Sequence, residues 1–129
     1  MNREIKFRGK RIDNDEWVYG YLHFEFNCTD EYVPFISWKD SSYLEDIGEE
    51  EINIKTIGQY TGLHDKNGKE IYKGDIAKYE NMTGKIMFFN GSFIMSDFEE
   101  TEEWELGVIN AETEVIGNIY DNPELLKGE

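Results

Sequence analysis

Residues 57–76 read IGQYTGLHDKNGKEIYKGDI, and the turn-forming residues of this stretch decide the fold class. Asn67-Gly68 lies between two runs that carry apolar residues, which is a strong short-range signal of a tight β-hairpin. Gly74-Asp75 marks a second chain reversal, in which the Asp75 carboxylate is expected to cap backbone N–H groups. We therefore predict a mostly β fold with a minor helical part. No residue in this stretch carries recognisable catalytic chemistry.

Short strands continue from this stretch to the C-terminus. We expect them at 76–79, 85–89, 92–96 and 115–120. A second Asn-Gly pair, Asn90-Gly91, joins two of these strands, and glycine-marked turns recur every ~8–12 residues. This spacing predicts a small SH3-like barrel over roughly 71–120. Asn122, as an N-cap, and Pro123 predict a short C-terminal helical turn.

Gly58 and Gly117 occupy similar local sequences. Each follows an isoleucine and precedes an amide residue, in Ile57-Gly58-Gln59 and Ile116-Gly117-Asn118. So few matching residues do not establish an internal repeat. We expect both glycines to have structural roles where strands pack closely.

The N-terminal part also has strand patterns. Residues 4–8 alternate polar and apolar side chains, and residues 17–26 are rich in aromatic side chains, so the two predict a β-hairpin. Gly20 is expected to form a bulge or bend. Residues 32–38 read as a short strand, which Pro34 would confine to a sheet edge.

The region before residue 57 ends in an acidic segment. Residues 41–51 contain five carboxylates and are expected to form an exposed loop or a short helical turn. At 129 residues the chain fits one domain. We divide this domain into an N-terminal β region with an acidic loop (1–56) and the barrel with its helical turn (57–129).

Composition indicates a folded, water-soluble protein. Hydrophobic residues make up 39% of the chain and aromatic residues 15%, which supplies enough apolar surface for a core. The apolar runs are too short to span a bilayer, and the N-terminus lacks the apolar stretch of a secretory signal. Cys28 is the only cysteine, so a disulfide framework or thiolate metal cluster is not expected. We expect a cytoplasmic location.

The net charge is strongly negative, and the charged residues are unevenly distributed. The formal net charge is −15, although residues 1–11 alone carry +4. An acidic surface repels nucleic-acid phosphates, which makes nucleic acid an unfavourable partner. Residues 45–51 and 97–105 hold the densest carboxylates, and the second stretch is expected to be a solvated helix or charged loop. Such clusters keep a protein soluble or attract a basic partner.

No group of residues in the sequence has the composition and spacing of an active site or a metal site. The run from Asp65 resembles the start of a calcium loop, but it lacks the glycine and glutamate that an EF-hand requires, so a hairpin turn is expected. His23 and His64 are 41 positions apart and have no metal-ligand spacing. A dyad of Cys28 with either histidine has no local support. We predict no catalytic residues, cofactor or bound metal, and no enzymatic activity.

Three segments together resemble the YopX family of phage and prophage proteins from Gram-positive bacteria. They are REIKFRGKRIDNDEWVYGYL (3–22), IGQYTGLHDKNGKEIYKGDI (57–76) and EVIGNIYDNPELL (114–126), with the 84–93 strand pair between them. The resemblance implies a mostly β fold with an SH3-like barrel and a life inside a bacterial host cell. It implies no catalytic residues. The acidic stretches at 41–51 and 97–105 fall outside the family's motifs.

We consider three hypotheses for the function of the protein. The first is a non-enzymatic phage accessory protein that acts through protein–protein contacts, as a homo-oligomer or with a host or phage protein. The second is an acidic nucleic-acid mimic that inhibits a host DNA-binding protein. Its candidate partner-binding residues are Glu99, Glu100, Glu102 and Glu103. The third is binding of single-stranded nucleic acid by the N-terminal cations, with Trp17 and Tyr19 stacking on bases.

Overall fold

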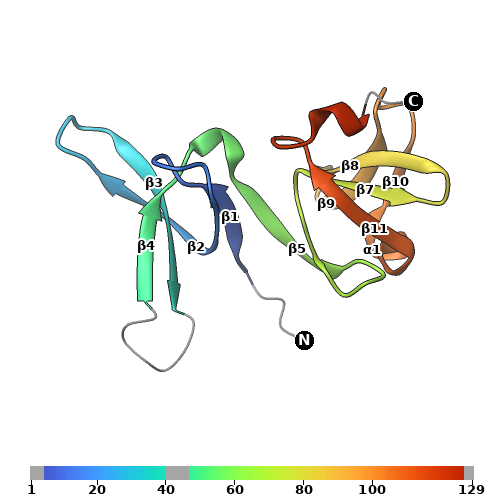
Figure 1. Ribbon diagram of the computed structural model, residues 1–129, viewed down its shortest axis with the longest axis horizontal. Coiled ribbons are helices and arrows are strands. Elements are labelled where there is room, and N and C mark those ends of the chain that lie inside the picture. The colour runs from blue at the N-terminus through green and yellow to red at the C-terminus, as the bar shows by residue number, and fades with distance from the viewer. Residues whose placement is uncertain (1–4, 40–46, 127–129) are drawn as a thin grey trace. The chain divides into compact units, whose positions relative to one another are not determined.

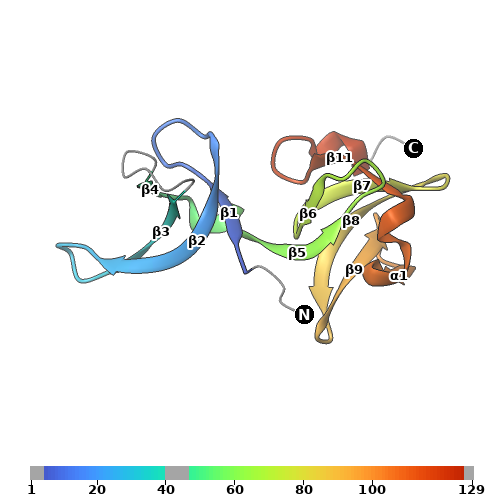
Figure 2. The ribbon, with the colours of Figure 1, turned by 90° about the horizontal axis from the view of Figure 1, so that it is seen from below.

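A computed structural model describes residues 5–39 and 47–126 (Figure 1 and Figure 2). The chain divides into two compact units, Met1–Gln59 and Tyr60–Glu129. Both units are built mainly from antiparallel strands. The prediction of a mostly β protein is confirmed.

Unit 1 is a sheet in which neighbouring strands are antiparallel. Its strands are β1 (Phe7–Lys10), β2 (Trp17–Phe26), β3 (Tyr32–Lys39) and β4 (Ile47–Glu51), in the order β4-β3-β2-β1. The predicted N-terminal hairpin is therefore present as β1 and β2. A 3-10 helix, η2 (Ile54–Thr56), leads to β5 (Gly58–His64), and the first two residues of β5 pair with β1. Gly58 is buried and pairs with Arg8 of β1.

Gly20 does not form the expected bulge. It pairs with Phe7 in an unbroken register between β1 and β2. A Cβ atom at Gly20 would lie 2.1 Å from the backbone oxygen of Ser37. The close approach of the β3 backbone accounts for a glycine at this position, and β2 as a whole is curved (Figure 2).

Pro34 does not confine its strand to an edge, which corrects the sequence expectation. β3 lies between β2 and β4. The Ile52 N–H donates to the Pro34 carbonyl at 3.1 Å, just beyond the end of β4 at Glu51. Because the N and C=O of a strand residue point to the same side, the missing N–H of proline costs a bond only where β4 has ended.

The acidic segment 41–51 was expected to be a loop or helical turn, and that expectation is wrong for its second half. Ile47–Glu51 is strand β4, paired with β3 from Phe35↔Glu51 to Lys39↔Ile47. Residues 41–46 lie outside the described part of the chain. Cross-strand pairing with β3 imposes extended structure on residues whose own sequence does not alternate.

Unit 2 contains a five-stranded antiparallel sheet in the order β10-β9-β8-β7-β11. Its strands are β7 (Asp75–Tyr79), β8 (Met82–Phe89), β9 (Ser92–Asp97), β10 (Glu103–Glu105) and β11 (Thr113–Asn118). The rest of β5 pairs with β6 (Glu70–Tyr72). Within the described residues β10 and β11 are the two sheet edges, and the sheet does not close into a barrel.

Short helical segments complete unit 2. They are α1 (Leu106–Ile109), η3 (Asn110–Glu112) and η4 (Pro123–Leu126). Pro123 opens η4, as expected for the C-terminal turn. The Asn122 side chain, expected to be a helix cap, instead accepts the Asn118 N–H at 3.2 Å. A Cβ atom at Gly117 would meet that same Asn122 oxygen at 2.6 Å, which explains the glycine.

The predicted turns are present. Asn90 and Gly91 have φ of 52° and 84°, the left-handed pair of a tight hairpin turn between β8 and β9. In the loop of the β5–β6 hairpin Gly68 is left-handed, with φ of 82°, but Asn67 is not, and the Asp65 N–H donates to the Lys69 carbonyl at 2.8 Å. This second hairpin loop is therefore wider than the two-residue turn that Asn-Gly predicts.

Two aspartates hold the turns of unit 2. The buried Asp75 carboxylate accepts the Tyr72 N–H at 2.8 Å, across a turn in which Gly74 has φ of 95°, so its expected capping role is confirmed. Asp65 is also buried. Its carboxylate accepts the N–H groups of Asn67, Lys69 and Val115, each at 2.9 Å. The loop that superficially resembled a calcium site is thus a hairpin fastened to β11.

The hydrophobic core of unit 2 is one contiguous cluster. It consists of Ile71, Ala77, Ile86, Phe93, Met95, Leu106, Ile109 and Val115. The inward-facing side chains of the sheet meet α1, which supplies Leu106 and Ile109. Burial of this apolar surface is the main source of stability for unit 2.

Candidate functional site

The acidic stretch 97–105 is a turn followed by strand β10, so the charged-loop reading holds for its first part. The Asp97 carboxylate accepts N–H groups from Thr101 at 2.8 Å and Glu102 at 3.1 Å, and the Thr101 hydroxyl at 2.6 Å. These hydrogen bonds, led by that of the Thr101 side chain, hold the pKa of Asp97 below its ordinary value. The turn therefore has a defined backbone shape.

The four candidate partner-binding residues, Glu99, Glu100, Glu102 and Glu103, are all exposed on this turn and the start of β10. Glu100 accepts a hydrogen bond from the Lys85 ammonium at 2.7 Å, which offsets part of its charge. A hollow of about 230 Å³ lies beside the turn. Its lining combines Met87, Phe89 and Ile94 with three of the four glutamates and neighbouring polar residues.

The other acidic stretch lies in unit 1. Glu49, Glu50 and Glu51 belong to β4, and Glu50 is 3.3 Å from the Arg11 guanidinium. Glu45 and Asp46 lie outside the described residues. The two acidic stretches therefore belong to different units of the chain.

The two histidines lie in different settings. His64, at the end of β5, lies 3.3 Å from the Tyr60 hydroxyl and stacks edge-on with that ring. His23 lies on β2. Cys28 is exposed in the β2–β3 turn. The grouping of potential ligands around His23 does not include Cys28, and no described contact joins them.

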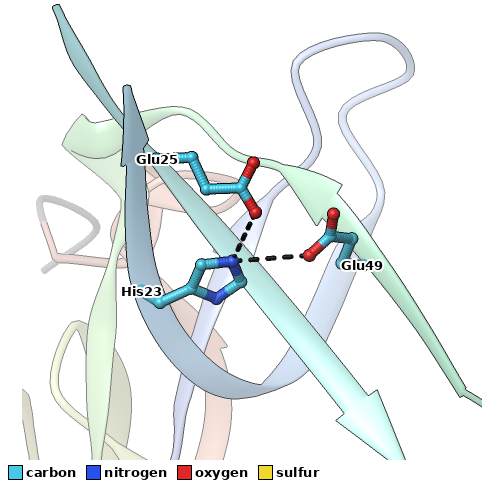
Figure 3. A group of neighbouring side chains, drawn as sticks. All are labelled: His23, Glu25 and Glu49. Atoms are coloured by element: carbon cyan, nitrogen blue, oxygen red, sulfur yellow. Dashed lines mark hydrogen bonds and ion pairs between the residues drawn. The ribbon is translucent and has the colours of Figure 1, made fainter. Parts of the chain in front are cut away.

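Figure 3 shows a cluster that the sequence did not predict: His23, Glu25 and Glu49. His23 Nε2 lies 2.9 Å from Glu25 Oε2 and 3.4 Å from Glu49 Oε1. One ligand atom from each residue lies within 4.8 Å of the other two. All three side chains are between one-third and one-half exposed. We name these three residues the His–Glu cluster.

Sheet geometry explains the His–Glu cluster. His23 and Glu25 are two residues apart on β2, so their side chains share one face of the sheet. Ser37 of β3 pairs with Tyr21 of β2 and with Glu49 of β4, so these three side chains share one face. Tyr21 lies two residues before His23, which places Glu49 on the same face as His23 and Glu25. The His23–Glu25 spacing is visible in the sequence, but Glu49 joins them only through the β3–β4 register.

The opposite face of the β2–β3 hairpin is apolar near its turn. Phe24, Phe26 and Tyr32 share this face, and we call them the hairpin tip. Their exposed fractions are 47%, 56% and 67%. Phe26 and Tyr32 are cross-strand partners whose rings pack edge-to-face, with centroids 4.4 Å apart. Large apolar side chains this exposed on one strand pair are typical of a contact surface.

Three of the residues expected to bind single-stranded nucleic acid contact one another. The Arg8 guanidinium lies over the Trp17 ring at 4.6 Å from its centroid, and the Lys10 ammonium at 5.6 Å. Arg8 is buried. Cation–π contacts within unit 1 therefore engage the aromatic face on which a base would stack.

Across the described part of the chain, none of the helices has the length and apolar character needed to cross a membrane.

Comparison with known proteins identifies the family. The YopX protein family model matches residues 6–127. The crystal structure of protein EF1440 from Enterococcus faecalis is similar, with a TM-score of 0.57 and 24% identity over 97% of this chain and 99% of that chain. The crystal structure of protein yopX from Bacillus subtilis has a TM-score of 0.51 and 20% identity over 100% and 99%. The comparison with curated proteins found no match. These two likenesses support the fold, and the family match covers nearly the whole length: the chain belongs to the YopX protein family.

Proposed function

We propose that this chain is a non-enzymatic accessory protein of a phage or prophage, acting in the bacterial cytoplasm through protein–protein contacts and assembling with copies of itself. The hairpin tip is the observation that carries this proposal. The phage setting follows from the family resemblance. We also propose that the five-stranded sheet of unit 2 is related to the SH3-like barrels, from which it differs in being open.

The occupant of the hairpin tip is, in this proposal, a second copy of the chain. Two copies that each carry a net charge of −15 repel one another. A stable contact between them must therefore bury enough exposed apolar surface to outweigh this repulsion. Phe24, Phe26 and Tyr32 provide such a surface, and aromatic side chains are enriched in interface cores.

The test is the molar mass of the full chain in solution, measured by light scattering after size-exclusion chromatography. The wild-type chain should be larger than a monomer at micromolar concentration. The double variant Phe26→Ser, Tyr32→Ser should be monomeric, because it removes the apolar contact. The matched control is Phe89→Ser, since Phe89 of unit 2 is 51% exposed and lies outside the hairpin tip. A monodisperse wild-type monomer, or an oligomer unaffected by the double change, would overturn self-assembly through this surface.

A second candidate function is mimicry of nucleic acid by the acidic turn. The supporting observation is that four glutamates are exposed on this turn and at the start of β10, and that the Asp97 hydrogen bonds define the shape of the turn. Spaced negative charges on a fixed backbone can imitate phosphates. Capture from phage-infected lysate, with and without nuclease, should then recover a DNA-acting host protein in both cases.

Charge reversal separates this candidate from the first. Changing all four glutamates to lysine should abolish that capture, whereas reversing Glu112 and Glu124, which are exposed elsewhere in unit 2, should not. Capture that persists after all four glutamates are reversed would contradict mimicry.

The third candidate, single-stranded nucleic-acid binding, predicts an affinity for oligonucleotides that falls as salt rises. No binding at low salt would contradict it.

A further inference from the structure

We propose that the His–Glu cluster binds a divalent transition-metal ion, of which Zn²⁺ is the working example. His23, Glu25 and Glu49 would be its ligands. This site is independent of the hairpin tip, which lies on the other face of the same strands.

The first argument is electrostatic. Two carboxylates converge on one ring nitrogen, at 2.9 Å and 3.4 Å. A nitrogen that carries one hydrogen can donate a good hydrogen bond to only one of them. The two carboxylates, which have oxygens within 4.8 Å of each other, also repel each other. A doubly charged cation between the carboxylates removes that repulsion.

The second argument is geometric. Zinc binds histidine nitrogen and carboxylate oxygen at about 2.0–2.2 Å, so two tetrahedral ligands lie ~3.4 Å apart. The separations of His23 Nε2 from the two carboxylate oxygens are close to this value. All three potential ligand atoms are within 4.8 Å of one another. Small side-chain adjustments are therefore sufficient to surround one ion.

The third argument concerns preorganisation. The His23 ring stacks on Phe35, its cross-strand partner, with centroids 5.7 Å apart and ring planes 19° apart. This stacking limits rotation of the imidazole. The three ligands also come from paired strands rather than from loops, which fixes their spacing and favours metal binding.

The chemistry of the ligands selects the class of ion. An imidazole nitrogen with carboxylates suits zinc and its first-row neighbours, whereas Mg²⁺ and Ca²⁺ prefer oxygen ligands alone. A chain this acidic also attracts cations loosely over its surface. Selective binding in the presence of excess Mg²⁺ therefore distinguishes a site from diffuse attraction.

The experiment is calorimetric titration of the full chain with Zn²⁺ in millimolar Mg²⁺, with Co²⁺ absorption as a second probe. We expect one Zn²⁺ per chain. His23→Asn, Glu25→Gln and Glu49→Gln should each weaken binding at least ~10-fold, because even outer-shell changes at metal sites cost ~10–100-fold. The d–d absorption bands of bound Co²⁺, which depend on ligand type and geometry, should change in His23→Asn.

Matched controls address the other histidine and a carboxylate between β2 and β3. His64→Asn and Glu31→Gln should bind Zn²⁺ as the wild-type chain does, since neither residue belongs to the His–Glu cluster. Circular dichroism without metal checks that every variant folds. Zn²⁺ affinity that is unchanged in folded His23→Asn, or abolished by Mg²⁺ in the wild-type chain, would overturn the proposal.

Discussion

The Asp65 carboxylate accepts N–H groups from its own hairpin, at Asn67 and Lys69, and from Val115 of β11. One buried side chain thus joins segments 50 residues apart in the sequence. The sequence indicated only that this aspartate begins a hairpin turn. Its bond to β11 could not be predicted, because no local pattern shows which strand will lie beside the loop.

Asp65→Asn should destabilise the protein by about 2 kcal/mol, since charged acceptors contribute ~1.5–3 kcal/mol and an amide NH₂ cannot accept a backbone N–H. The free energy of unfolding in urea measures this loss. Asp13→Asn is the control. It removes an exposed ion pair with Arg11 and should change stability by less than ~1 kcal/mol. Equal stability of Asp65→Asn and the wild-type chain would contradict this role.

Acidification should act through the same residue. Burial raises the pKa of Asp65, but the hydrogen bonds from Val115, Lys69 and Asn67 outweigh it and leave this pKa below its ordinary value of 3.8. A lowered folded-state pKa stabilises the protein above the unfolded-state value, and this contribution disappears as pH falls through the folded-state pKa. The stability gap between wild type and Asp65→Asn should therefore be full at pH 7 and shrink below about pH 4–5. A gap independent of pH in urea titrations would argue against it.

At the scale of strands and turns, local sequence was informative where turn chemistry dominates. Asn90-Gly91 and Gly74-Asp75 were expected to reverse the chain, and both do. Sequence reasoning failed where the local structure depends on pairing with a strand that is distant in the sequence. β4 has no alternating pattern of its own, and Pro34 is tolerated in an inner strand because β4 ends before it. The same limit hid the His–Glu cluster, because Glu49 reaches His23 only through cross-strand register.

Gly20→Ala should disrupt the β2–β3 pair. The added Cβ would overlap the Ser37 backbone oxygen at 2.1 Å, and backbone cannot move aside as a side chain can. Overpacking of this kind costs ~1–3 kcal/mol or more. Gly107→Ala is the control, since its Cβ would meet nothing within 4 Å, and alanine favours a helical position such as α1. Thermal unfolding should show a lower midpoint only for Gly20→Ala; a shared or absent shift would refute the packing argument.

At the scale of the whole chain, the buried apolar residues are divided unequally between the units. The contiguous core lies entirely in unit 2, whereas among the described residues of unit 1 only Ile36 and Ile52 are fully buried hydrophobic side chains. The sequence, with its evenly spread aromatics, did not predict this difference. Many aromatics of unit 1, such as those of the hairpin tip, are exposed.

Amide hydrogen exchange should follow this division. Protection depends on the free energy of local opening, which rises with buried apolar contact. We expect the amides of β7, β8 and β9 to exchange more slowly than those of β2 and β3, by mass spectrometry at neutral pH. Self-assembly at the hairpin tip would slow β2 and β3, so the comparison requires the monomeric Phe26→Ser, Tyr32→Ser variant. Equal protection in that variant would show that stability is not concentrated in unit 2.

Strand β5 has a consequence for how such a gene can change. Domains that recombine freely are usually joined by a linker with few cross-contacts. Here the boundary between the units falls inside a strand, after Gln59, and the two parts of β5 pair with β1 and with β6. A recombination event that replaced one unit would have to preserve a strand used by the other. The two halves should therefore be inherited together, in keeping with a family match and structural likenesses that extend over nearly the entire length.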